Sequence, residues 1–133
     1  MRLDLYKESD SKQESGSPCY LGDGSFDVKR IHTPEYNKQI EDIRKKEYGL
    51  APKEINTNLI LATWLAEYGV TGWDGILGDN DDPVKFTRQN ARKVFLNPAY
   101  FLSLNAILIQ HASDYNNYLY DEAIEDVEVI KKS

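Results

Sequence analysis

A chain of 133 residues can bury a hydrophobic core without help from a disulfide or a metal, and we expect a single domain. Hydrophobic residues make up 41% of it and charged residues 29%, a balance that predicts a folded rather than a disordered protein. The net charge of −6 argues against a nucleic-acid partner, because duplex binding draws on clustered Lys and Arg side chains.

Cysteine content and hydropathy bear on the compartment. The one cysteine, Cys19, cannot form an intramolecular disulfide, which suits a reducing environment. The first residues lack the apolar core of a signal peptide, and no apolar stretch reaches the 18 residues expected of a membrane span. We therefore expect a soluble, acidic, intracellular protein that does not enter a membrane.

Strand and turn signals dominate residues 1–33. Leu3 and Leu5 alternate with polar neighbours, which predicts a half-buried strand, whereas the polar stretch 7–17 predicts a loop. Two further strands are expected at 19–21 and within 26–31, on either side of a turn at 22–24. A sheet of two or three antiparallel strands is small, so helices should cover one of its faces.

Helical signals dominate residues 34–133. Thr33 can cap a helix that starts at Pro34 and ends at Gly49. A second helix should run from Pro52 to Gly69, and its wide apolar stripe marks it as the central core helix, with Trp64 in the core.

The rest of the chain should continue the helical part. We interpret 69–86 as a connection, after which Thr87 caps a short helix over about 88–96. Asn97 and Pro98 should end that helix and begin a last long one, which either continues or breaks near 116–117 and resumes toward Ile130. The expected fold is mainly α, with a small N-terminal antiparallel β element packed on a bundle of four to five helices.

Catalytic groups are scarce. The two histidines lie far apart in sequence: His32 precedes a helix cap and should face solvent, whereas His111 lies on an apolar helix face and should be packed or hydrogen-bonded in the core. One cysteine cannot build a thiolate zinc site, and Cys19 would need a distant contact to pair with either histidine. We expect no catalytic residues, no cofactor and no enzymatic activity.

The acidic run 79–82 resembles part of a calcium loop but fails the EF-hand pattern. The sixth position, which requires Gly, is Val84, and the twelfth, which requires Glu, is Asn90. A solvated acidic turn is the preferred interpretation, and we expect no metal site. The glycines at 69, 72, 75 and 78 do not form a phosphate-binding loop, and they indicate flexibility around Trp73.

Aromatic side chains are the remaining candidates for binding. Trp73 is either an anchor folded back onto the helices or a partner-facing hot spot. The last helix carries Tyr100, Tyr115, Tyr118 and Tyr120, which suit either helix-in-groove contacts or self-association, although some of them could simply be core residues.

Three motifs within residues 24–120 give a family resemblance. They are FDVKR at 26–30 leading into TPEYN at 33–37, LATWLAEYGV at 61–70 leading into Gly72-Trp73, and PVKFTRQNA at 83–91. In these motifs the chain resembles the tail assembly chaperones of long-tailed bacteriophages. The polar stretch 7–17 departs from the family pattern.

The resemblance implies a mainly helical fold and a function in the host cytoplasm. Such a protein binds the tape-measure protein while the tail forms, shields its long helices from aggregation and helps recruit tail tube subunits. On this basis we expect the client to bind near Trp73, Phe86, Tyr100, Tyr115 and Tyr118. Self-association into a homo-oligomer is compatible with these residues, whereas nucleic acid and membrane are not expected partners.

Other functions stay open at this stage. The first alternative is a structural virion protein, such as a tail-completion or head–tail joining subunit. The second is a small enzyme that uses the carboxylates at 74 and 79–82 with a divalent metal, and the third is an antitoxin or adaptor.

Overall fold

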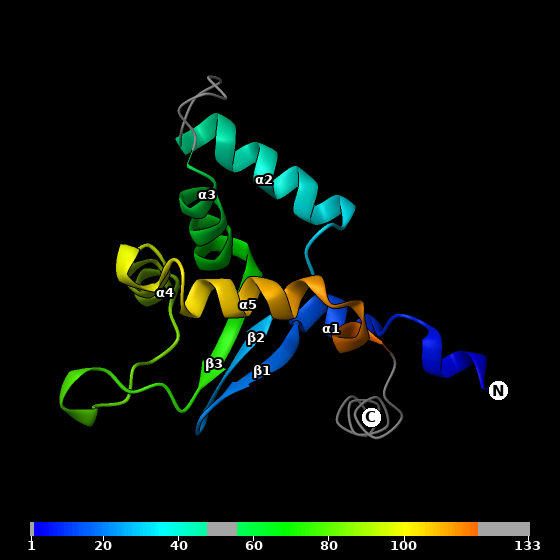
Figure 1. The fold of residues 1–133 in the computed structure, drawn as a ribbon, viewed down its shortest axis with the longest axis horizontal. Helices are drawn as coiled ribbons and strands as arrows, with labels where there is room; N and C mark the ends of the chain where they lie inside the picture. The colour runs from blue at the N-terminus through cyan, green and yellow to red at the C-terminus, as the bar shows by residue number, and fades with distance from the viewer. Residues whose placement is uncertain (1, 48–55, 120–133) are drawn as a thin grey trace.

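The computed structural model describes residues 2–47 and 56–119 (Figure 1). Five α-helices, three strands and several short 3₁₀ or π segments are found in these residues. In chain order they are η1 (Leu3–Tyr6), α1 (Asp10–Ser15), β1 (Ser17–Leu21), β2 (Gly24–Val28), α2 (Pro34–Glu47), α3 (Thr57–Trp64), η3 (Leu65–Gly69), β3 (Val70–Asp74), η4 (Asp79–Asp81), α4 (Arg88–Phe95), η5 (Pro98–Tyr100), α5 (Leu104–Ser113) and η6 (Tyr115–Tyr118).

The N-terminal prediction was wrong in two places. Leu3 and Leu5 lie in a 3₁₀ helix, η1, and not in a strand. Alternation alone does not make a strand, because the backbone also needs a neighbouring strand, and the described sheet contains only β1, β2 and β3. The expected loop at 7–17 contains α1, whose first turn is capped by the Ser9 hydroxyl accepting from the Lys12 N–H at 3.2 Å.

The predicted hairpin is confirmed. β1 and β2 pair antiparallel with Leu21 opposite Gly24, so that Gly22 and Asp23 form a two-residue turn. Gly22 has a φ of 60°, which a glycine adopts without the steric cost that a Cβ imposes. Strand β2 ends at Val28, three residues before the alternating pattern does.

The third strand corrects the prediction of a purely N-terminal β element. Strand β3 lies in the stretch interpreted as a helix connection, and it pairs antiparallel with β2, with Phe26 opposite Trp73. The sheet therefore joins two segments that lie more than forty residues apart in sequence, with a register irregularity at Asp27/Val28. Gly72 and Asp74 weaken the strand signal of this stretch, and the strand forms because the free edge of β2 supplies the pairing.

Helix α2 follows its predicted cap, whereas α3 does not. The Thr33 hydroxyl accepts from the Tyr36 N–H at 3.1 Å at the start of α2. The predicted end of this helix at Gly49 lies outside the described residues. The next helix begins at Thr57 and not at Pro52, because Asn56 is extended and its side-chain oxygen caps the helix by accepting from the Asn58 N–H at 2.9 Å. Helix α3 passes into the single π turn η3, which stops at Gly69 as expected.

The last helix is broken earlier than predicted. Asn97 does cap a helix through its side chain, but that helix is the 3₁₀ turn η5. Ser103, with φ −120° and ψ −93°, separates η5 from α5, and α5 ends at Ser113. The expected continuation toward Ile130 lies outside the described residues.

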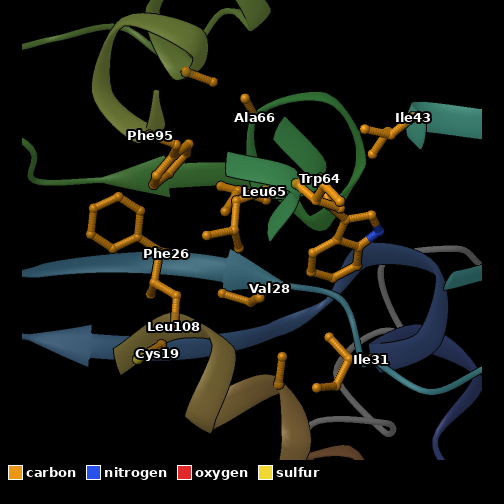
Figure 2. Packing of buried hydrophobic residues seen from close by; sticks show 14 residues of the cluster. Cys19, Phe26, Val28, Ile31, Ile43, Trp64, Leu65, Ala66, Phe95 and Leu108 are labelled. Carbon is orange, nitrogen blue, oxygen red and sulfur yellow. The ribbon is translucent and has the colours of Figure 1, made fainter. Parts of the chain in front are cut away.

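The core lies between one face of the sheet and helices α3, α4 and α5 (Figure 2). Along β2 the buried residues alternate with half-buried ones, so one face of the sheet is covered and the other is more open. Trp64, Leu65, Phe95 and Leu108 are each at most 1% exposed, which confirms Trp64 as a core residue and α3 as the central helix.

Candidate functional site

Trp73 and Phe86 lie together, and Trp73 acts as an anchor. The two rings meet edge to face with centroids 5.0 Å apart, and Trp73 also contacts Phe26 and Phe95 at 6.0 and 6.2 Å. The Trp73 Nε1–H donates to the Val84 carbonyl at 2.7 Å. Trp73 is half-buried and ties the loop that follows β3 back onto the sheet.

The motif around Phe86 is explained by local and tertiary bonds. The Thr87 hydroxyl caps α4 by accepting from the Asn90 N–H at 3.0 Å, and the Asn90 amide donates to the Lys85 carbonyl at 2.9 Å. The Arg88 guanidinium donates to the carbonyls of Ala66 and Val70 at 3.1 and 2.7 Å. These residues therefore hold α4 against the end of η3. This gives a structural reason for the spacing of Thr87, Arg88 and Asn90 in the motif.

The three tyrosines among the candidate site residues differ in accessibility. Tyr118 is 0% exposed, and its hydroxyl donates to the Val28 carbonyl at 2.7 Å; burial raises its pKa. Tyr100 and Tyr115 are 40% and 57% exposed. Tyr118 is thus a core residue, and the exposed pair is available for contacts.

An apolar groove lies between α3 and the segment formed by η5 and α5, and its volume is about 360 Å³. We call it the α3–α5 groove. Its apolar lining consists of Leu61, Phe101, Leu102, Ala106 and Ile109, and its polar lining consists of three amide side chains and one serine. No ionisable side chain lines it among the described residues.

Leu102 leaves a large apolar side chain exposed in the lining of this groove. It is 82% exposed at the break between η5 and α5, next to the exposed Tyr100. The groove was not predicted from the sequence, because Phe101 and Leu104 were expected in one continuous helix, whereas the chain breaks between them at Ser103. The adjacent pair Phe101-Leu102 was the available signal, since consecutive helix residues point about 100° apart and such a pair widens the apolar stripe.

Asn105 is a buried polar residue in the lining of the α3–α5 groove. It is 4% exposed, and its Nδ2 donates to the Phe95 carbonyl at 2.8 Å. Its Oδ1 has no hydrogen-bond partner among the described residues. A buried acceptor of this kind carries a desolvation cost.

Carboxylates do not gather into a metal site in the described part of the chain. Residues 2–47 and 56–119 contain no group of three or more His, Cys, Asp or Glu side chains that could hold an ion. The run 79–82 is exposed, with Asn80 and Asp81 at positive φ. On the sheet, burial raises the pKa of Asp27, and the nearby Asp74 carboxylate adds to this effect.

His111 is half-buried and hydrogen-bonded, as the sequence predicted. Its Nε2 lies 3.2 Å from the Ser17 hydroxyl, and the Asn117 amide donates to its Nδ1 at 3.2 Å. Protonation would place an N–H against the Asn117 amide group. Burial lowers the pKa of His111, and the hydrogen bond with Ser17 and the Asp114 charge oppose that effect only in part.

The His111 environment predicts a pH dependence of stability. The folded pKa lies below the ordinary value of 6.5, so the unfolded chain binds more protons just below that pH. Stability should be full above about pH 6.5 and should fall as the pH drops toward the folded pKa. Urea unfolding at about pH 7.5 and about pH 5.5 measures this loss.

His111→Gln provides the control for that measurement. The variant should lose less stability between the two pH values than the native protein, because its amide does not titrate. Asp27, whose raised pKa acts in the opposite direction, is present in both proteins and cancels. Equal losses in the two proteins would contradict the assignment.

The described residues contain no helix that is long and apolar enough to cross a membrane. The model of a family described as YdaY prophage protein matches residues 30–129 of the chain. No curated protein and no solved structure matches it.

Proposed function

The chain belongs to the YdaY prophage protein family, and from this premise we propose that it is a phage tail assembly chaperone. In this role it binds the tape-measure protein in the host cytoplasm and helps tail tube assembly. The family match supports the phage origin. The resemblance of residues 26–37, 61–73 and 83–91 to tail assembly chaperones supports the finer role.

The observation that carries the proposal is the α3–α5 groove. An elongated helical client presents apolar stripes that aggregate when they are exposed, and an apolar groove is the usual receptor for one face of such a helix. This groove is lined by apolar and uncharged polar residues, and Leu102 stands 82% exposed beside it. A client helix would therefore bury apolar surface by docking in this groove.

The charge of the protein fits the same role. The chain carries a net charge of −6, yet none of the described groove-lining residues is ionisable. A client stripe can enter the groove without desolvating a charge, and the net negative charge of the chain favours a soluble complex.

The client surface proposed from the structure differs from the one expected from the sequence. Tyr100 stays in it, because η5 adjoins the groove through Phe101. Trp73 and Phe86 pack against each other and support the sheet, and Tyr118 is buried. The proposed site therefore centres on Leu102.

Co-expression with the tape-measure protein of the same prophage tests the function. The native protein should raise the soluble fraction of the client, and Leu102→Asp should weaken binding by roughly tenfold or more, since burying a leucine contributes about 1.5–3 kcal/mol. Binding is measured by pull-down of a tagged client and titration of the purified complex.

Leu77→Asp is the matched control. Leu77 is 56% exposed and lies outside the groove, so this variant should bind as the native protein does. Circular dichroism should show both variants folded. If the client is no more soluble with the native protein than without it, the proposal fails; stoichiometric amounts of the protein in purified virions would indicate a structural virion protein instead.

A further inference from the structure

The first residues of the chain form an apolar arm. We call residues 2–7 the N-terminal arm; its side chains Leu3, Leu5 and Tyr6 are 74%, 41% and 66% exposed. Figure 1 shows this segment, in dark blue, extending away from the body beyond the end of α5. Three large apolar side chains on so short a segment are typical of a surface that another element covers.

The base of the arm is held firmly. Ser9 is 1% exposed, and its N–H donates to the Tyr118 carbonyl at 2.8 Å. The Lys12 ammonium donates to the Leu119 carbonyl at 2.8 Å. These bonds fix the direction in which the arm leaves the body, which lowers the entropy cost of docking it elsewhere.

The α3–α5 groove is the matching surface on the same protein. It is apolar, uncharged in its described lining, and open at Leu102. No arm residue lines it within the chain. The exposed apolar side chains of the arm and the apolar groove do not meet within one chain, so they can be complementary between two molecules.

Charge favours a second copy as the occupant of the groove. Arg2 and Lys7 against Asp4 leave the arm at +1, so the remaining residues carry −7. A second copy therefore offers the arm an apolar groove on a chain whose other residues are net acidic. We propose that the N-terminal arm of one copy docks in the α3–α5 groove of another, and that reciprocal exchange closes a symmetric dimer.

The exchange would also control the access of a client to the groove. A docked arm and a client helix exclude each other, so a client must displace the arm before it binds. This consequence rests on the proposed function, whereas the self-association does not, because it involves this chain alone.

Disulfide trapping without any client tests the docking. Leu5→Cys protein is mixed with size-tagged Leu102→Cys protein under mild oxidation; the native Cys19 is buried. The mixture should yield a mixed disulfide of both chains, close to twice the 15.3 kDa of one chain before the tag is counted. Leu77→Cys replaces Leu102→Cys as the control for random collision, since Leu77 is also exposed.

Two outcomes overturn the proposal. One is a mixed disulfide that forms no faster with Leu102→Cys than with Leu77→Cys. The other is a Leu5→Cys/Leu102→Cys double variant that cross-links only within one chain, which would mean that the arm fills its own groove. Either result leaves the client-solubility test unaffected, so failure here is distinguishable from failure of the proposed function.

Light scattering gives a second readout. The native protein should show a concentration-dependent dimer, and Leu5→Asp should raise its dissociation constant by roughly tenfold or more, since a buried leucine side chain is lost. Leu77→Asp should leave the dissociation constant unchanged. A native protein that stays monomeric across the accessible concentrations contradicts the exchange.

Discussion

Replacing Trp64 with alanine should lower the free energy of unfolding by about 3–5 kcal/mol, the range for removing a large aromatic side chain from a core. Trp64 is 1% exposed, and its ring meets Tyr36 edge to face at 5.0 Å. Its Nε1–H donates to the Gln39 side-chain oxygen at 2.9 Å. The variant should therefore lose packing between α2 and α3 together with one hydrogen bond, as measured by chemical denaturation.

Two further variants make this result interpretable. Trp64→Phe keeps a ring but loses the indole N–H, so its cost should be clearly smaller than that of Trp64→Ala. Tyr100→Ala removes a ring that is 40% exposed and should change stability by about 0.5 kcal/mol or less. If Trp64→Ala costs no more than Tyr100→Ala, the core assignment is wrong.

Gly69→Ala should destabilise the protein by about 1–3 kcal/mol, the usual cost of overpacking a core. A Cβ at this position would lie 2.4 Å from Cζ3 of Trp64 and under 3 Å from two further atoms of the same ring. The ring cannot move aside freely, because Tyr36 and Gln39 hold its other contacts. Thermal and urea unfolding both measure the effect.

Gly72→Ala is the matched control for Gly69→Ala. A Cβ there would meet only the Asp27 carboxylate, at 3.5 Å, which is ordinary contact. This variant should be close to neutral, because a compatible Gly→Ala change also reduces the entropy of the unfolded chain. Similar losses in the two variants would show that the contact with Trp64 does not explain the need for Gly69.

Much of the helical part could be predicted because its signals are local. Thr33 and Thr87 each accept from a backbone N–H three residues ahead, and Asn97 accepts from one two residues ahead. Such bonds depend on a few neighbouring residues, so the sequence alone reveals them. The hairpin turn at Gly22 and Asp23 is readable for the same reason.

The candidate site was less predictable. Trp73 was recognised as a candidate, either as an anchor or as a partner-facing residue. The choice depends on which residues cover its ring, and Phe26 and Phe95 come from distant parts of the chain. The groove around Leu102 depends on the break at Ser103 and on the packing of α5 against α3. No single window of sequence contains both partners of that contact.

The sequence by itself determined the size, the acidic charge, the starts of α2 and α4, the hairpin and the central position of α3. Only the tertiary structure decided that 70–74 forms a strand, that the last helix breaks, and that an apolar arm and an apolar groove both remain on the surface. The physical reason is the sequence separation of the interacting residues: the hydrogen bonds of caps and turns join residues two to four positions apart. Strand β3 needs the edge of β2, and the groove needs α3 and α5 side by side.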